Sequence, residues 1–243
     1  MTGLALFDLD DTLLDHRGAV SRGILDHVDG LPDLPVPDRD GSVALWHELE
    51  DTHYHRYLSG ELTFAGQRRA RAQDFATAHG ITLADIEADA WFDSYFESYR
   101  DAWALFDDAL PCLDRLAASG WRLGIITNGE QDYQRVKLER TGLIDRFEHV
   151  IASGAVGVAK PDPRIFAHAC ELFGVAPDNA FYVGDRLLTD AVGAASAGLD
   201  GIWLNRFGDD VVVGAVGHGT SDADPVALAR DAGVRTIATL DEL

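Results

Sequence analysis

The sequence predicts an α/β fold in which a Rossmann-like parallel sheet carries an inserted bundle of α-helices. Short apolar runs bounded by polar residues occur at the start of the chain and again in its second half, which is typical of strands buried on both faces of a sheet. Between residue 16 and about residue 103 the apolar spacing is helical throughout. The 243 residues, 47% of them hydrophobic, are enough for one large domain or two modest ones.

The first strand is expected at residues 4–7, and Asp8 and Asp10 follow it at once. Residues two apart on an extended backbone point to the same side, and ligands of open α/β sheets bind beyond the carboxyl ends of strands. Two carboxylates about 4 Å apart repel each other by about 4 kcal/mol at an effective dielectric constant near 20. The pair therefore indicates a bound metal ion or a proton shared with substrate. An acidic turn that ends a strand is the alternative interpretation.

The insert is expected to form a small helical bundle. One helix is predicted over residues 41–58, and another is predicted to open at Thr82, with Asp85 completing a capping box. An aromatic stripe at helical spacing follows, and such stripes usually pack in a core. Its members are Phe92, Phe96, Tyr99 and Trp103. We expect residues 16–104 to form a separate helical domain and residues 1–15 with 105–243 to form the α/β core.

Further strands are expected in the second half, and polar residues follow several of them. The predicted strands are 122–127, 149–152, 180–183, 201–204 and 235–238. Thr127 with Asn128, then Lys160, then Asp185 with Asp190 come after successive strands, where a helix start can bind phosphate. The stretch 206–224 is irregular, and we assign it no function; a helix is expected near residues 225–232.

Composition excludes several classes of partner. Asp and Glu number 41 against 20 Lys and Arg, which gives a net charge of −21 and argues against nucleic-acid polymers and anionic membranes. The start of the chain does not resemble a signal peptide, and no apolar run approaches the length of a membrane span, so we expect a cytoplasmic protein. Cys112 and Cys170 lack metal-ligand spacing and are expected to be reduced and structural.

Four short motifs, taken together, resemble those of the haloacid dehalogenase-like (HAD) hydrolase superfamily. They are, in order, Asp8-Leu9-Asp10-Asp11-Thr12, Thr127-Asn128, Lys160-Pro161, and Gly184-Asp185 with Asp190. The insert resembles the helical C1 cap of subfamily I, and residues 127–205 look most similar to the nucleotidase and N-acylneuraminate-9-phosphatase-like branch. This resemblance implies a core sheet with strand order 3-2-1-4-5.

The resemblance also implies chemistry for the first and last motifs. Asp8 would attack phosphorus and form an aspartyl-phosphate, while Asp10 would protonate the leaving alcohol and then accept a proton from water. Mg²⁺ would be held by the carboxylates of Asp8 and Asp185 and the carbonyl of Asp10. Asp190 would bind the ion through water or orient the other ligands.

The two middle motifs would bind the phosphoryl group. Thr127 and the Asn128 amide would hold its oxygens, and Lys160 would offset negative charge beside the nucleophile. The expected function is therefore a Mg²⁺-dependent phosphatase acting on a small phosphorylated metabolite, as a monomer or homodimer. A phosphomutase, a 2-haloacid dehalogenase and a non-catalytic regulatory relative are alternatives. Asp10, Asp185 and Asp190 favour the phosphatase over the dehalogenase, which needs neither an acid for an alcohol nor Mg²⁺.

The two lysines of the chain are given different expectations. Arg occupies 18 of the 20 basic positions, yet Lys160 stands in a motif, which suggests that a compact ammonium is required there. Lys137 is expected on the exposed face of a helix over residues 130–141, where replacement by Arg should change little.

Overall fold

The computed structural model describes residues 3–31, 34, 36–208 and 229–243. The chain divides into two compact units, one formed by Met1–Asp15 with Ala104–Leu243 and the other by His16–Trp103. Most of the irregular stretch at 206–224, and the start of the helix expected near 225–232, lie outside the described residues. Among the helices that are described, none combines the length and the apolar character that crossing a bilayer requires.

The first unit is built on a parallel six-stranded sheet with the order β3-β2-β1-β4-β5-β6. Its strands are β1 (Leu4–Phe7), β2 (Arg122–Thr127), β3 (His149–Ala152), β4 (Ala180–Gly184), β5 (Asp200–Leu204) and β6 (Arg235–Ile237). The expected order 3-2-1-4-5 is confirmed, and β6 extends the sheet beside β5. All four residues of β1 are buried, as the apolar run predicted, because β1 lies between β2 and β4 in a parallel sheet that is covered on both faces.

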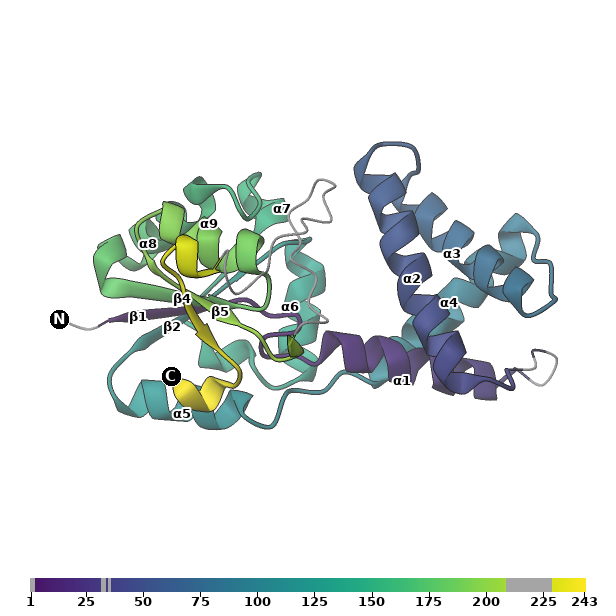
Figure 1. Cartoon of the computed structure of the whole chain (residues 1–243), viewed down its shortest axis with the longest axis horizontal. Helices are drawn as coiled ribbons and strands as arrows, with labels where there is room; N and C mark the ends of the chain where they lie inside the picture. Colours follow the sequence, from purple (N-terminus) through teal and green to yellow (C-terminus); the bar gives the residue numbers. More distant parts are fainter. Residues whose placement is uncertain (1–2, 32–33, 35, 209–228) are drawn as a thin grey trace. The chain divides into compact units, whose positions relative to one another are not determined.

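Helices cover both faces of this sheet, with α8 and α9 on one face and α5 on the other (Figure 1). The helices of the unit are α5 (Ala109–Ala118), α6 (Gln131–Arg140), α7 (Ser153–Val156), α8 (Pro163–Phe173) and α9 (Gly193–Ser196). A π-helical segment, η3 (Leu187–Val192), precedes α9, and the described part of the unit also contains the short 3-10 turns η1 (Ile144–Arg146), η2 (Pro177–Asn179) and η5 (Leu240–Glu242) and a helical end at residues 229–231.

Helix α8 shows how local sequence fixes an element against the sheet. Asp162 caps its first turn by accepting a hydrogen bond from the Arg164 amide, Pro163 occupies the first turn, and Gly174 ends the helix with a φ of 64°. Its buried face includes Phe166 and Phe173, which pack in one cluster with residues of β1, β2 and β4. Complete burial of such an apolar side chain contributes about 1.5–3 kcal/mol.

Over its described residues, the second unit is a bundle of four helices with an aromatic core. The helices are α1 (His16–Asp29), α2 (Arg39–Leu58), α3 (Phe64–Ala78) and α4 (Asp85–Asp101). Trp46 of α2 lies at the centre, with its ring centroid 5.2 Å from that of Phe75 on α3 and 4.6 Å from that of Tyr95 on α4. The predicted aromatic stripe belongs to this core: Phe92 and Tyr99 are buried, and Phe96 and Trp103 pack against the cluster.

The predicted capping box at Thr82 is wrong. Helix α4 begins at Asp85 with Ala84 as its N-cap residue, and the carboxylate that reaches back is that of Glu87, whose Oε2 accepts the Ala84 amide at 2.8 Å. Glu87 lies three residues beyond the observed N-cap, which is the spacing that this interaction requires.

The two segments that connect the units are hydrogen-bonded to each other within the first unit. The Asp15 amide donates to the Ala104 carbonyl at 2.9 Å, and the Phe106 amide donates to the Leu13 carbonyl at 3.0 Å. The side chain of Arg206, which follows β5, also joins the two segments. Its guanidinium donates to both carboxylate oxygens of Asp108 and to the Thr12 carbonyl. The points where the chain leaves and re-enters the core are therefore adjacent.

Candidate active site

The residues singled out in the sequence gather at one edge of the sheet. Asp8 directly follows β1, Thr127 is the last residue of β2, and Asp185 directly follows β4. Lys160 lies in the loop between α7 and α8, after β3, and reaches the same edge with its side chain. Because the strands are parallel and adjacent, their carboxyl ends lie together, as expected for a ligand site in an open α/β sheet.

Asp8 and Lys160 form a buried ion pair. Lys160 Nζ lies 2.6 Å from Oδ1 of Asp8, and both residues are less than a tenth exposed. The pKa of Asp8 is raised to about 7: burial raises it most, the charge of Lys160 lowers it, and the charge of Asp190 raises it. A carboxylate in this environment is poorly solvated and held in one direction, which suits a nucleophile.

Lys160 has two more partners, one of which the sequence analysis missed. Its Nζ donates to Oδ1 of Asp190 at 2.7 Å and contacts the hydroxyl oxygen of Tyr182 at 2.7 Å. Burial alone would lower the pKa of Lys160, but Asp190 and Asp8 outweigh burial and raise it. The sequence could have indicated a role for Tyr182, because the hydroxyl of a tyrosine inside an apolar strand needs a buried hydrogen-bond partner.

The side chain of Asn128 holds the backbone of Lys160. Its Nδ2 donates to the Lys160 carbonyl at 3.0 Å, and its Oδ1 accepts the Lys160 amide at 2.9 Å. This pair of hydrogen bonds joins the loop after β3 to the end of β2 and fixes the position from which the lysine reaches Asp8. Because the Asn128 side chain is engaged with Lys160, the backbone amide of Asn128 is the group that would contact a phosphate. The neighbouring Thr127 is buried at the end of β2.

Asp10 forms an ion pair with Lys137, which the sequence predicts on the exposed face of a helix. That expectation is wrong: Lys137 on α6 is 2% exposed, and its Nζ lies 2.7 Å from both carboxylate oxygens of Asp10. The buried face of α6 consists of Gln134, Lys137 and Leu138, which are spaced three and four residues apart. Burial alone would lower the pKa of Lys137, but the Asp10 carboxylate outweighs burial and raises it.

The backbone turns sharply after Asp10. Asp11 has a φ of 57°, a left-handed conformation that Asp tolerates better than most side chains. Its amide donates to the Leu14 carbonyl at 2.7 Å, and the amides of Leu13 and Leu14 both donate to the Leu9 carbonyl. This hydrogen-bonded turn fixes the backbone of the first motif beyond the end of β1.

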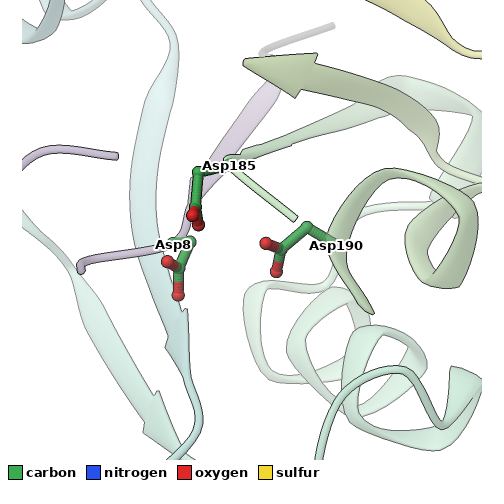
Figure 2. Close-up of side chains that lie close together, drawn as sticks. All are labelled: Asp8, Asp185 and Asp190. Carbon is green, nitrogen blue, oxygen red and sulfur yellow. The ribbon is translucent and has the colours of Figure 1, made fainter. Parts of the chain in front are cut away.

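Three carboxylates form a compact acidic cluster. One oxygen from each of Asp8, Asp185 and Asp190 lies within 4.8 Å of the others. Figure 2 shows Asp8 and Asp185 beside each other, with Asp190 facing them from the adjacent helical segment. Burial, and then the charges of Asp190 and Asp8, raise the pKa of Asp185 well above its usual value. An all-oxygen donor set whose charges are crowded and poorly solvated fits a hard divalent cation such as Mg²⁺.

Asp190 is positioned by the π-helical segment η3, which follows β4. Its Oδ2 accepts the Arg186 amide at 2.9 Å, and its own amide donates to the Arg186 carbonyl at 2.8 Å. A Cβ at Gly184 would overlap the carboxyl group of Asp190, so a glycine is required at the end of β4. Asp190 thus combines a place in the acidic cluster with a hydrogen bond to Lys160.

The parallel sheet and the carboxylates and lysine at its carboxyl edge together define a hydrolase of the HAD type. The family model for haloacid dehalogenase-like hydrolases matches residues 2–198, more than three quarters of the sequence. The chain therefore belongs to the haloacid dehalogenase-like hydrolase family.

Individual relatives are phosphatases with different substrates in their names. The chain is 48% identical over 204 residues to pyrimidine 5'-nucleotidase YjjG of Escherichia coli, which covers 82% of this chain and 84% of that protein. It is 27% identical over 223 residues to N-acylneuraminate-9-phosphatase of Mus musculus, covering 83% and 82% of the two chains. The expected similarity to this branch is confirmed.

Among solved structures, the HAD-hydrolase YfnB of Bacillus subtilis has the same fold. The superposition covers 99% of this chain and 96% of that one, with a TM-score of 0.74 and 21% sequence identity.

Proposed function

We propose that the protein is a Mg²⁺-dependent phosphatase that hydrolyses a small phosphate monoester through an aspartyl-phosphate on Asp8. The observation that carries the proposal is the contact of Lys160 Nζ with Asp8 at 2.6 Å, beside a carboxylate cluster at the carboxyl edge of the sheet. A buried cation next to a buried nucleophile supplies the charge stabilisation that phosphoryl transfer mainly requires of a protein.

In the first half-reaction, Asp8 attacks phosphorus. A bond forms between a carboxylate oxygen of Asp8 and phosphorus while the bond from phosphorus to the ester oxygen breaks. Lys160 directs the Asp8 carboxylate and offsets charge on the phosphoryl oxygens. Thr127 and the Asn128 backbone amide, at the end of β2, hold those oxygens, and the Asn128 side chain keeps Lys160 in place.

Asp10 carries the proton in both half-reactions. It protonates the ester oxygen as the alcohol departs, and its carboxylate then accepts a proton from the water that attacks the aspartyl-phosphate. The second step breaks the bond between Asp8 and phosphorus, releases inorganic phosphate and returns Asp10 to its protonated form. Separate carboxylates are needed because the nucleophile is bonded to phosphorus while the second proton transfer occurs.

We assign Mg²⁺ to the carboxylates of Asp8 and Asp185 together with the carbonyl of Asp10. When bound, the ion supplies positive charge to the transferring phosphoryl group. Asp190 fits the role of orienting group better than that of direct ligand, because protein donors approach both of its oxygens: Lys160 and Tyr182 at one and the Arg186 amide at the other.

The substrate is a small phosphorylated metabolite, and we propose that the helical unit His16–Trp103 acts as the cap that selects it. A nucleotidase and a sugar-acid phosphatase are both relatives of this chain, so the shared core does not define the alcohol part of the substrate. A cytoplasmic location and a monomeric or homodimeric state stay predictions.

The test is phosphate release by purified protein. We expect hydrolysis of p-nitrophenyl phosphate that EDTA stops and added Mg²⁺ restores, and we expect Asp8→Asn to abolish both turnover and trapping of a phosphorylated protein. A panel of nucleoside monophosphates, sugar phosphates and phosphoglycolate would then identify the substrate. Chloride release from 2-haloacids, isomerised sugar phosphates without net hydrolysis, or full activity of Asp8→Asn would each contradict the proposal.

A further inference from the structure

A second buried lysine contacts the first motif, and none of the four motifs contains it. Lys137 lies on α6, and its side chain is only 2% exposed. Its Nζ is 2.7 Å from Oδ1 and 2.7 Å from Oδ2 of Asp10, whose side chain is 29% exposed. The ring of Tyr133, one turn earlier on α6, lies 4.9 Å from the same ammonium group. The ion pair is therefore enclosed on the lysine side and open on the aspartate side.

This geometry fixes the direction of the Asp10 side chain. Equal distances to the two oxygens place the ammonium nitrogen midway between them, so the whole carboxyl group is drawn toward Lys137 as toward a point charge. Helix α6 begins three residues after Asn128, so the element that presents Lys137 is the one that follows the proposed phosphate-binding residues. The carboxyl group of Asp10 and the phosphoryl group would then be positioned by the same part of the fold.

We propose that Lys137 is a positioning residue for the proton transfers made by Asp10, an inference that rests on the proposed phosphatase function. As the ester bond breaks, the proton moves from Asp10 to the alcohol oxygen, and negative charge develops on the Asp10 carboxylate. An ammonium group already in contact with both oxygens stabilises that charge without reorganisation. When water attacks the aspartyl-phosphate, the same contacts hold the carboxylate in place to accept the proton.

The leaving group distinguishes this role from a purely structural one. p-Nitrophenolate departs readily without a proton, whereas an alkoxide does not, so only alkyl phosphates depend strongly on Asp10 as an acid. The value of kcat/KM reports steps up to the first irreversible one, which is departure of the alcohol. We therefore compare kcat/KM for p-nitrophenyl phosphate with that for the best alkyl phosphate of the substrate panel.

We expect Lys137→Met to lower kcat/KM by at least about 10²-fold for the alkyl phosphate and by less than about 5-fold for p-nitrophenyl phosphate. Asp10→Asn should show the same selective loss. The double variant should lose no more than Asp10→Asn alone, because Lys137 acts through Asp10. Lys137→Arg should restore most of the alkyl phosphatase activity, since a guanidinium pairs with both oxygens of a carboxylate. Arg135→Met, on the exposed face of α6, is the matched control and should leave both values unchanged.

The outcomes separate this inference from the proposed function. A wild-type protein that hydrolyses neither ester contradicts the proposed function. An active wild type with equal losses on both esters in Lys137→Met, or with additive losses in the double variant, overturns the role of Lys137. If circular dichroism shows that Lys137→Met is unfolded, Lys137→Gln replaces it, and the same comparison of the two esters decides.

Discussion

Lys160 Nζ lies 2.6 Å from Oδ1 of Asp8, and the only other lysine of the sequence, Lys137, lies 2.7 Å from both carboxylate oxygens of Asp10. Each aspartate proposed to react thus has its own buried ammonium group. The other 18 basic residues are arginines. An ammonium is compact and can sit among several acceptors, whereas a guanidinium is a wide planar fork.

Lys160→Arg is expected to lower kcat by at least about 10²-fold, the loss typical when one transition-state donor is removed. Three acceptors from different elements surround the ammonium of Lys160, on Asp8, Tyr182 and Asp190, and a planar fork cannot meet all three. Steady-state phosphate release measures the effect. Arg164→Lys, at an exposed arginine four residues further on, is the control and should keep wild-type turnover. Near-normal turnover of folded Lys160→Arg would remove this lysine from the active site.

Replacement of Asp185 and of Asp190 by asparagine is expected to have different effects on Mg²⁺ affinity and on kcat. Asp185→Asn should raise the Mg²⁺ concentration for half-maximal activity by more than about 10-fold, because a ligand is lost. Asp190→Asn should mainly lower kcat at saturating Mg²⁺, because it disturbs the contacts with Lys160, Tyr182 and the Arg186 amide. Titration calorimetry with Mg²⁺ measures binding independently of turnover. Equal changes in Mg²⁺ affinity for the two variants would contradict the separate roles.

His27 is expected to make the stability of the helical unit depend on pH. Burial lowers its pKa to about 4, its Nε2 atom has no hydrogen-bond partner among the described residues, and its ring packs edge-on against Trp91. The unfolded chain takes up a proton near pH 6.5 and the folded chain only near pH 4. The stability is therefore fully present above about pH 6.5 and falls as the pH drops toward 4, by up to about 3 kcal/mol.

Denaturant unfolding of His27→Leu at several pH values between 4 and 6.5 tests this expectation. The unfolding free energy of the wild type should fall with decreasing pH by up to about 1.4 kcal/mol per pH unit more than that of the variant. His55→Leu, at an exposed position of α2, should keep the wild-type slope. An unchanged slope in His27→Leu would show that His27 is protonated in the folded protein over this range.

Arg206→Met is expected to destabilise the first unit by about 3 kcal/mol, the usual cost of leaving a buried charge without its partner. The side chains of Arg206 and Asp108 are 9% and 12% exposed, and Asp108 also accepts the Leu240 amide at 2.9 Å. Adding Asp108→Asn should recover part of the loss, because the uncompensated charge disappears. Arg230→Met, at an exposed arginine, should change the unfolding free energy by no more than about 0.5 kcal/mol. Additive losses in the double variant would contradict the pairing.

The sheet and most of the site were predictable because each depends on a local pattern. Buried strands read as apolar runs, and Asp8, Thr127 and Asp185 stand at strand ends, where parallel topology brings them together. The role of Lys137 was not predictable in this way. Helix α6 has only Val136 and Leu138 as aliphatic residues, and two residues at that spacing do not define a helical face.

Side-chain hydrogen bonding was also beyond the sequence patterns. The pairing of Asn128 with the Lys160 backbone and the contact of Tyr182 with Lys160 join residues more than twenty positions apart. Both contacts depend on how closely the ends of neighbouring strands approach each other. The spacing of apolar residues along the sequence carries no information about that distance. The composition nevertheless pointed to these lysines, since both lysines of an arginine-rich chain contact an aspartate that we propose to react.

The hydrogen bond between the Asp15 amide and the Ala104 carbonyl has a consequence for how such proteins diversify. Because these residues are one hydrogen bond apart, at 2.9 Å, a short turn could replace the whole of His16–Trp103 without moving either end of the core. The insert could thus be exchanged as a unit, by evolution or by design, while Asp8 and Asp10 and the two lysines that contact them stay in place in the core. If the helical unit selects the substrate as we propose, grafting a different helical segment at this junction would change the substrate and leave the proposed chemistry of the core unchanged.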